Sequence, residues 1–334
     1  GGGMTQELLR EYEAVRTQAG LIDYSAWGFV AVRGSDRTGF LQNLLTNDIK
    51  ALQPGTGCQA CLLSPTAKLL ADLLVLAEPD AHWLLVHRSR RQSVLDTLER
   101  YHIMEDVQLE DWTTRLGLLW LLGPESLAIA SEVCAQPITQ ASAYAHERLA
   151  IEGAPLWAIH HGLGRAPGLM VAIDAEQAAW LWQKLLEQGR QHGLVPIGWE
   201  TLNVLRLEAG VPWYGVDMDE TTLLSETGLE EHAASFTKGC YVGQEVLARL
   251  QTYGSLSRKL MGLVCDGQKP PQTGDSICHQ DEPIGQITSA VYSPALKRPI
   301  ALGYVKRPWY EAGRAVTITH GANAISATLV KIPQ

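Results

Sequence analysis

The sequence lacks any apolar run long enough to cross a membrane, and it is poor in positive charge. Its longest apolar run, residues 116–123, is far shorter than the roughly 20 residues that a transmembrane helix needs. The chain has 27 lysines and arginines against 36 aspartates and glutamates, which gives a net charge of −9. Phosphate binding needs a positive field, so we expect no direct nucleic-acid binding beyond a local basic patch at Arg88, Arg90 and Arg91. Because the residues after Met4 are polar and helical in pattern rather than a signal peptide, we expect a soluble, cytoplasmic protein without a membrane partner.

The short motifs of several common enzyme classes are also missing. There is no G-x-x-x-x-G-K-[ST], H-E-x-x-H or G-x-S-x-G pattern, and the glycine-rich segment 161–168 does not have G-x-G-x-x-G spacing. These absences argue against phosphoryl transfer, zinc or serine hydrolysis and a Rossmann site. His160 and His161 are adjacent, so on a strand they would face opposite sides, and we interpret both as structural.

Six cysteines in a chain of 334 residues do not suggest a disulfide framework. Cys58 and Cys61 form a single C-x-x-C. This pair is either a redox pair or half of a metal site, or it is two small residues on the faces of a strand pair. No second pair follows at zinc-finger spacing, so we predict no tightly bound metal.

The order of the predicted elements indicates an α+β protein. The first four are a helix, a strand, a helix and a hairpin, at residues 7–19, 28–34, 36–48 and 58–78. Strands and helices then alternate without regular βαβ units, which is typical of α+β layers. After Arg258, six short strands separated by turns indicate a small β-barrel or sandwich. We therefore predict a body over residues 4–257, divided into two parts near residue 142, and a barrel over residues 258–334.

One cysteine stands in an unusual setting, the stretch TKGCYVGQEVLARL at residues 237–250. A helix is predicted to begin near Gly243, so Cys240 would lie just before its first turn, where the helix dipole favours a thiolate. Lys238 would add a nearby cation, and Gly239 would let another molecule approach the sulfur. The residues alone leave two interpretations open, a reactive thiolate or a buried structural cysteine.

A second stretch, LRLEAGVPWYGVDMDE at residues 205–220, leads from a helix into an aromatic and acidic loop. Glu208 could accept two hydrogen bonds from the N–H edge of a heterocycle bordered by these rings. In the alternative interpretation, Arg206 and Glu208 form a salt bridge that anchors the helix.

Together the two stretches resemble the YgfZ-type folate-binding proteins, relatives of the glycine-cleavage T-protein GcvT, which is an aminomethyltransferase. KGCYVGQE at residues 238–245 is similar to the K-G-C-[FY]-x-G-Q-E signature, and RLEAG at residues 206–210 is similar to the pterin-contacting stretch. The resemblance implies an α+β folate-binding body of two interlocked subdomains around a central cavity, with a C-terminal β-barrel. It implies Cys240 and Lys238 as the reactive residues. The folate-binding residues that it implies are Glu208, Arg206, Tyr214, Asp217, Gly239, Tyr241 and Gln244.

For function, the resemblance implies a tetrahydrofolate-dependent accessory factor for the assembly or maintenance of [4Fe–4S] proteins. Its partners would be iron–sulfur client or scaffold proteins, and a link to tRNA modification would be indirect. The alternative is a folate-dependent aminomethyltransferase or demethylase. Against it, the catalytic aspartate of aminomethyltransferases aligns with Val94, and Asp96 lies two residues further on, on another face of a helix. A third alternative is an interaction scaffold that does not bind folate.

Overall fold

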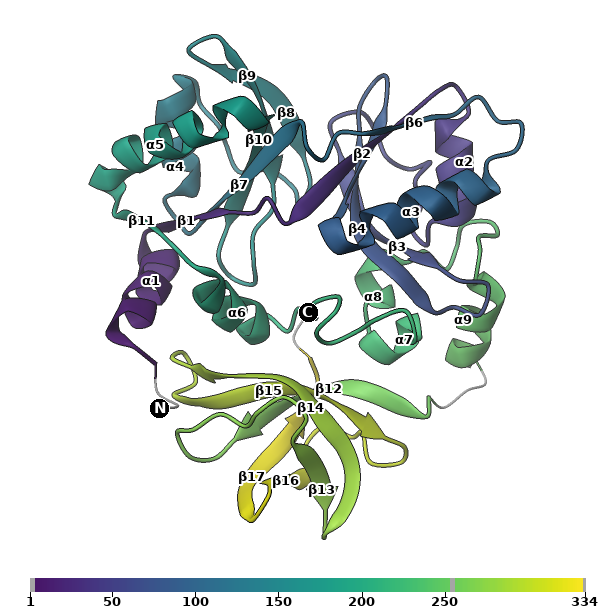
Figure 1. The fold of residues 1–334 in the computed structure, drawn as a ribbon, viewed down its shortest axis with the longest axis vertical. Helices are drawn as coiled ribbons and strands as arrows, with labels where there is room; N and C mark the ends of the chain where they lie inside the picture. Colours follow the sequence, from purple (N-terminus) through teal and green to yellow (C-terminus); the bar gives the residue numbers. More distant parts are fainter. Residues whose placement is uncertain (1–3, 253–255, 333–334) are drawn as a thin grey trace.

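The computed structural model describes residues 4–252 and 256–332, and it contains two β-sheets flanked by helices beside a closed β-barrel (Figure 1). Helix α1 (Gln6–Thr17) begins where the Thr5 hydroxyl accepts a hydrogen bond from the Leu8 N–H at 3.1 Å. It is shorter than the predicted helix because Ala19 already belongs to a strand. In the described ranges, no helix combines the length and the apolar character needed to span a bilayer.

The first sheet has five antiparallel strands in the order β3-β4-β5-β2-β6. These strands are β2 (Trp27–Arg33), β3 (Gly57–Leu63), β4 (Leu69–Ala77), β5 (His82–His87) and β6 (Gln108–Asp111). Successive side chains of a strand point to opposite faces. The outer face packs against α2 (Arg37–Leu44) and α3 (Arg88–Tyr101), which contribute Leu41 and Leu98 to one buried cluster with Val30.

The second sheet has six strands in the order β11-β1-β7-β10-β9-β8. They are β1 (Ala19–Asp23), β7 (Leu116–Leu122), β8 (His146–Ile151), β9 (Ala154–His160), β10 (Gly168–Asp174) and β11 (Leu194–Pro196). Helices α4 (Ser126–Cys134) and α5 (Ala178–Gly189) cover its outer face, with short 3-10 helices at Ala175–Gln177 and Arg190–His192.

The two sheets are interlocked, because β1 precedes the first sheet in the chain but pairs with β7 and β11 of the second. The chain passes from the first sheet to the second between Asp111 and Leu116, ahead of the predicted division near residue 142. The reason for the difference is that β7 is a continuous apolar run, whose pattern does not reveal which sheet it joins.

The inner faces of the two sheets share one core. Phe29 and Leu85 enter it from the first sheet, Trp120 and Met170 from the second, and Leu205 from helix α6. Side chains on these inner faces are therefore brought together from distant parts of the sequence.

Helix α6 (Trp199–Glu208) and three short helices, α7 (Leu224–Thr227), α8 (Glu230–Ala233) and α9 (Gln244–Thr252), lie between the sheets and the barrel (Figure 1). The barrel closes in the order β12-β15-β14-β13-β16-β17, as the predicted barrel requires. Its strands are β12 (Arg258–Cys265), β13 (Ser276–His279), β14 (Glu282–Ser293), β15 (Arg298–Lys306), β16 (Ala315–His320) and β17 (Asn323–Val330). Residues 253–255, just before the predicted domain junction, and the last two residues of the predicted barrel lie outside the described residues.

Candidate functional site

Arg206 of α6 is enclosed by protein and forms an ion pair with Asp217 rather than with Glu208. Its other guanidinium contacts are also within the protein, to Asn203 Oδ1 at 2.8 Å and to Ser289 Oγ at 2.8 Å. The salt bridge between Arg206 and Glu208 is absent because residues two apart on a helix point in different directions.

Asp217 completes this polar cluster between the body and the barrel. Its carboxylate accepts hydrogen bonds from Thr288 Oγ1 at 2.5 Å and Ser289 Oγ at 2.6 Å, both on β14, and from the Trp213 N–H at 2.9 Å. The side chains of Arg206 and Asp217 are 2% and 0% exposed, so neither is free to bind a ligand here. The structure thus gives both predicted folate ligands a different role, that of joining α6 to the barrel.

Glu208 ends α6 and is only half-buried. The Tyr12 hydroxyl donates to both of its carboxylate oxygens, at 2.8 and 3.0 Å, and the Ser293 hydroxyl donates to one of them at 2.5 Å. Burial, followed by the hydrogen bond to Glu208, raises the pKa of Tyr12. Two neutral donors leave part of the acceptor capacity of a carboxylate unused, so Glu208 can still accept N–H groups from a ligand.

Tyr214 lies next to the start of β4. Its hydroxyl donates to the Leu69 carbonyl at 3.0 Å, and the Arg90 guanidinium lies over its ring, 4.7 Å from the centroid. Burial raises the pKa of Tyr214 to about 12. Its hydroxyl hydrogen and one ring face are therefore already engaged by the protein.

Cys240 is exposed, and it is the only exposed cysteine of the six, all of which lie within the described residues. Of the two interpretations left open by the sequence, a buried structural cysteine does not hold. Burial raises the pKa of the Cys58 thiol to about 12 and that of Cys134 to about 11. The pKa of Cys61 is raised well above its ordinary value for the same reason.

Lys238 points away from solvent into the C-terminal end of α2. Its ammonium donates to the carbonyl oxygens of Gln42 at 2.8 Å, Leu45 at 2.5 Å and Asn47 at 2.5 Å. Burial lowers the pKa of Lys238 to about 8. Since an ammonium has three donors, none remains for Cys240. The structure therefore makes Lys238 a positioning residue that fastens the cysteine loop to α2.

The other residues of the KGCYVGQE stretch shape this loop. The Tyr241 ring is buried in a cluster with Cys61 and Leu247, and its hydroxyl has no hydrogen-bond partner among the described residues. The Gln244 side-chain amide reaches the Gly239 carbonyl at 3.5 Å. Gly239 itself is exposed, and a side chain there would meet no atom within 4 Å. The sulfur can thus be approached from the side of Gly239.

The structure does not bring Glu208 and Cys240 together. Glu208 contacts α1 and the barrel, whereas the cysteine loop contacts α2, and no interaction in the described part of the chain joins them. Figure 1 shows α6 and α9 on opposite sides of the space between the sheets and the barrel. Tyr12 and Ser293, which donate hydrogen bonds to Glu208, were not among the predicted site residues. No local sequence pattern marks either of them.

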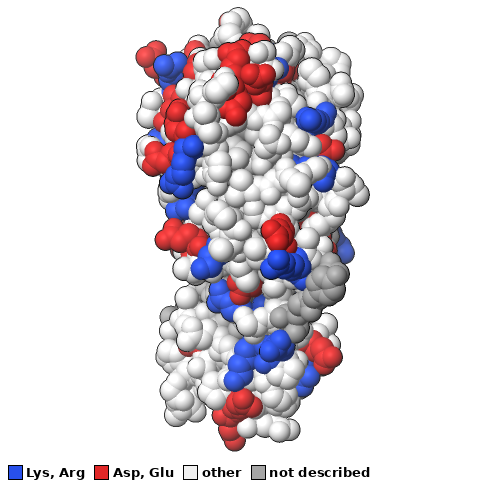
Figure 2. All heavy atoms as spheres, turned by 90° about the vertical axis from the view of Figure 1, so that its right-hand side faces the viewer, with Lys and Arg blue, Asp and Glu red and all other residues white. Residues whose placement is uncertain are grey.

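The predicted C-x-x-C and basic patch are both structural. Cys58 packs against the outer core of the first sheet and Cys61 against the cluster on the other face, so the two thiols do not pair. In the described ranges no three His, Cys, Asp or Glu side chains gather as a metal site. Each of the three arginines has a partner within the protein. Arg88 donates to the Thr113 carbonyl, Arg90 pairs with Glu220, and Arg91 pairs with Asp111. Figure 2 shows basic and acidic side chains interspersed on the right-hand face of the molecule in Figure 1.

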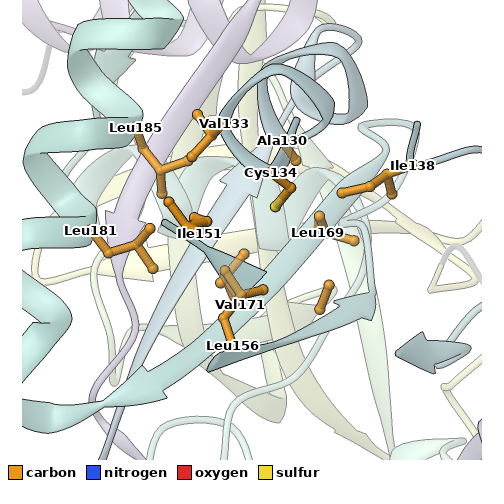
Figure 3. Close-up of a pocket in the computed structure, with 11 residues that line it drawn as sticks. Ala130, Val133, Cys134, Ile138, Ile151, Leu156, Leu169, Val171, Leu181 and Leu185 are labelled. Carbon is orange, nitrogen blue, oxygen red and sulfur yellow. The ribbon is translucent and has the colours of Figure 1, made fainter. Parts of the chain in front are cut away.

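A small pocket behind the second sheet has an apolar lining and does not suit a polar ligand (Figure 3). The Cys134 thiol is the only heteroatom on its lining side chains, so nothing could orient a heterocycle there. The residues around it are Ala130, Val133, Cys134, Ile138, Ile151, Leu156, Ala158, Leu169, Val171, Leu181 and Leu185.

Two family models account for almost all of the sequence. The GCVT N-terminal domain matches residues 2–237, and the glycine cleavage T-protein C-terminal barrel domain matches residues 258–334. The chain belongs to the GcvT family. This assignment confirms the predicted GcvT-like α+β body with its C-terminal barrel.

Among GcvT-family relatives, the aminomethyltransferase of Bacillus licheniformis is 29% identical over 97% of this chain and 89% of its own length. The aminomethyltransferase of a Synechococcus species is 30% identical over 98% of this chain and 90% of its own. The crystal structure of the glycine cleavage system aminomethyltransferase T from Bartonella henselae gives a TM-score of 0.87 at 25% identity, over 98% and 89% of the two chains. These relatives carry the name aminomethyltransferase, and the YgfZ-type branch stays a prediction.

Helix α3 carries the two residues, Val94 and Asp96, at which the sequence predicts a departure from the aminomethyltransferase pattern. Val94, the position that our sequence comparison predicts to correspond to the catalytic aspartate of aminomethyltransferases, is 1% exposed and packs into the outer core of the first sheet. Asp96 is exposed on α3, where it accepts a hydrogen bond from the Gln92 amide at 2.8 Å. Val94 has no carboxylate, and the carboxylate of Asp96 lies two residues away from the aligned position.

Proposed function

We propose that this GcvT-family chain binds a tetrahydrofolate through Glu208 and serves the assembly or maintenance of [4Fe–4S] proteins, with Cys240 as its reactive group. The observation that carries this proposal concerns two positions, one that lacks a carboxylate and one that has an exposed thiol. Val94, at the position predicted to correspond to the catalytic aspartate, is buried and has no carboxylate, and an exposed thiol stands in the loop that Lys238 fastens to α2. A hydrocarbon side chain cannot move protons, whereas an exposed thiol can react.

The surroundings of Glu208 fit a folate. A negative charge at the C-terminal end of a helix is disfavoured by the helix dipole, so the charge of Glu208 at the end of α6 has a local cost in stability. The hydroxyls of Tyr12 and Ser293 hold its carboxylate in place and leave acceptor capacity for the N–H groups of a pterin. When bound, tetrahydrofolate would supply one-carbon or redox chemistry, and the part of Glu208 is to bind and orient it.

Tetrahydrofolate affinity tests this binding step. Glu208→Gln should weaken binding roughly 10- to 100-fold, since hydrogen bonds to a charged group contribute about 1.5–3 kcal/mol. Glu200→Gln is the matched control, because Glu200 is exposed in the first turn of the same helix. Equal affinity of wild type and Glu208→Gln would contradict the assignment of Glu208.

Cys240 is the group proposed to handle sulfur or iron. A single thiolate is too few ligands for a stable metal site, so any metal contact would be shared with a partner protein. In native protein, iodoacetamide should label Cys240 at least about tenfold faster than the buried Cys61 and Cys265, as measured by peptide mass spectrometry. Labelling of all three at one rate would remove the basis for calling Cys240 reactive.

The cellular role is tested by complementation. Cells that lack such a factor should regain [4Fe–4S] enzyme activities with the wild-type chain but not with Cys240→Ala, and Cys278→Ala serves as the matched control. Full rescue by Cys240→Ala would overturn the role of the thiol, whatever its labelling rate.

The second candidate function is folate-dependent one-carbon transfer, and the names of the relatives favour it over the first. It predicts tetrahydrofolate-dependent product formation from an aminomethyl or methyl donor. Asp96 is the carboxylate nearest in sequence to the aligned position, so Asp96→Asn should abolish that activity if the candidate holds. Turnover by the wild type that is lost in Asp96→Asn would replace the first proposal by the second.

A further inference from the structure

A hollow of about 460 Å³ lies between helix α1 and the turn that leads from α5 into β11, and Figure 1 shows α1 beside β11. The opposite face of α1, which carries Tyr12, packs into the inner core. The residues of α1 that line the hollow have the spacing i, i+3, i+4 and i+7 of a single helix face, and they are Arg10, Glu13, Ala14 and Thr17. This face therefore directs its polar side chains toward the hollow rather than into the core.

The other wall is the short segment 190–195. Arg190 begins a 3-10 turn, and Gly193 follows that turn with a φ of 75°, a left-handed conformation that glycine adopts without strain. A Cβ atom at Gly193 would lie 2.2 Å from Cδ of Gln18, so only glycine lets this wall approach the end of α1 so closely. Leu194 and Val195 of β11 add apolar surface to the lining. The hollow thus combines an apolar part with polar side chains from two distant segments.

Two arginines meet at this hollow without a counter-ion. Neither Arg10 nor Arg190 has a hydrogen bond or an ion pair with any residue in the ranges 4–252 and 256–332. Glu13 also lines the hollow, but within those ranges it pairs with neither guanidinium. Two cations against one carboxylate give the lining a positive field, although the whole chain has a net charge of −9. An anion bound between the two arginines would relieve their mutual repulsion.

We propose that this hollow binds a small molecule that carries an oxyanion, a carboxylate or a phosphate, between Arg10 and Arg190. A guanidinium fits either group, because its N–H donors form a planar fork that matches two oxygens. The Gln18 amide lines the same hollow, has no hydrogen bond to any described residue, and offers two further N–H donors. The apolar side chains of β11 can contact the rest of the molecule.

This site does not depend on the proposed folate binding. Glu208 is held by Tyr12 and Ser293, and none of these three residues lines the hollow. Failure of tetrahydrofolate to bind would therefore leave the inference standing, and failure of the anion to bind would leave the assignment of Glu208 standing.

Succinate and inorganic phosphate are the probes, titrated into the whole chain by isothermal titration calorimetry at low ionic strength. At least one should bind with a dissociation constant of about 1 mM or lower, and the one that binds more tightly distinguishes a carboxylate ligand from a phosphate ligand. Arg10→Gln and Arg190→Gln should each weaken binding roughly 5- to 20-fold, less than at a buried site because water screens an open hollow. Arg165→Gln is the matched control, since Arg165 is exposed, has no partner among the described residues and does not line the hollow.

Glu13→Gln gives a readout that a purely structural role would not change. It removes the acidic side chain of the lining, so the affinity for the anion should increase, roughly 2- to 5-fold. Without ligand, the melting temperatures of all these variants should stay within about 2 °C of the wild type, because none of the replaced side chains has a partner among the described residues. Equal affinity of the wild type and both arginine variants would overturn the inference. The same holds if neither probe binds saturably, or if Glu13→Gln binds the anion more weakly than the wild type.

Discussion

The Arg206–Asp217 cluster encloses its polar side chains, whereas the Lys238–Cys240 loop leaves one of them accessible to solvent. In the cluster, both charges are enclosed, and each guanidinium nitrogen of Arg206 donates to a protein oxygen. In the loop, the ammonium of Lys238 is equally occupied, but the neighbouring thiol of Cys240 is exposed. Both regions are rich in polar residues, and only one keeps a group accessible.

Solvent access and unused hydrogen-bonding capacity therefore distinguish a candidate site from a structural cluster. Glu208 lies between the two cases, since two hydroxyls hold it and part of its acceptor capacity stays free. Arg206 and Glu208 are only two residues apart on α6, yet they belong to different categories. Substitutions that remove partners should therefore affect stability strongly in the closed cluster and less elsewhere.

The largest effect is expected in the closed cluster. Arg206→Met leaves the Asp217 carboxylate buried without its cation, and breaking such a pair costs about 3–5 kcal/mol in the free energy of unfolding. Urea unfolding of wild type and variant measures the loss. In the double variant Arg206→Met/Asp217→Leu the loss should be smaller than the sum of the two single losses. A decrease below about 1 kcal/mol in Arg206→Met would contradict the description of the cluster as a closed ion pair.

A smaller effect is expected in the loop. Lys238→Met removes three hydrogen bonds to carbonyls in the last turn of α2 and just beyond it, and should lower the free energy of unfolding by about 1.5–3 kcal/mol. It should also increase hydrogen exchange at residues 235–243, because the loop is no longer fastened to α2. Lys306→Met is the matched control, since Lys306 is exposed and its ammonium pairs with the exposed Glu282. Unchanged exchange in the loop would show that Lys238 does not position it.

Much of the fold could be predicted because its signals are local. Helix periodicity, the hairpin tip at Ser64 and the run of short strands after Arg258 each lie within a few residues, and the α+β body with a barrel follows from them. The pairing of β1 with β7 joins segments about a hundred residues apart. Both are apolar runs that fit either sheet, so the point where the chain changes sheets had no local signal.

The site was less predictable because its contacts are long-range. The acceptors of Lys238 are backbone carbonyls 191 to 196 residues away, and any residue type could supply them. Tyr12 reaches Glu208 across 196 residues. The sequence interprets His160 and His161 as structural but does not name the ring on which His161 stacks, that of Trp120, 41 residues away. Which face of a strand is the functional one depends on the partner sheet, and the sequence does not state it.

Glu208 should respond with an intermediate effect. Tyr12→Phe removes the hydroxyl that bonds both carboxylate oxygens and should lower the free energy of unfolding by about 1 kcal/mol. The ring stays in the core, so packing is kept. Urea unfolding measures this change, and Tyr292→Phe, outside the buried core, is the control. A loss as large as that of Arg206→Met would place Glu208 in the same closed category as the cluster.

The smallest effect is expected at His192, where the charges are only partly buried. Its ring contacts Glu132 at 2.9 Å and Glu125 at 3.1 Å, and the hydrogen bond to Glu132 is the largest cause that raises the pKa of His192. Because the folded-state pKa is raised, the stabilising contribution is complete below the unfolded value of about 6.5 and is lost as the pH rises through the folded value. The difference in unfolding free energy between wild type and His192→Gln should therefore be larger at pH 5.5 than at pH 8.5. Water and salt screen such pairs, so added salt should reduce the difference further. A difference that grew with pH would reverse the sign of this linkage and would mean that His192 is held neutral in the folded state.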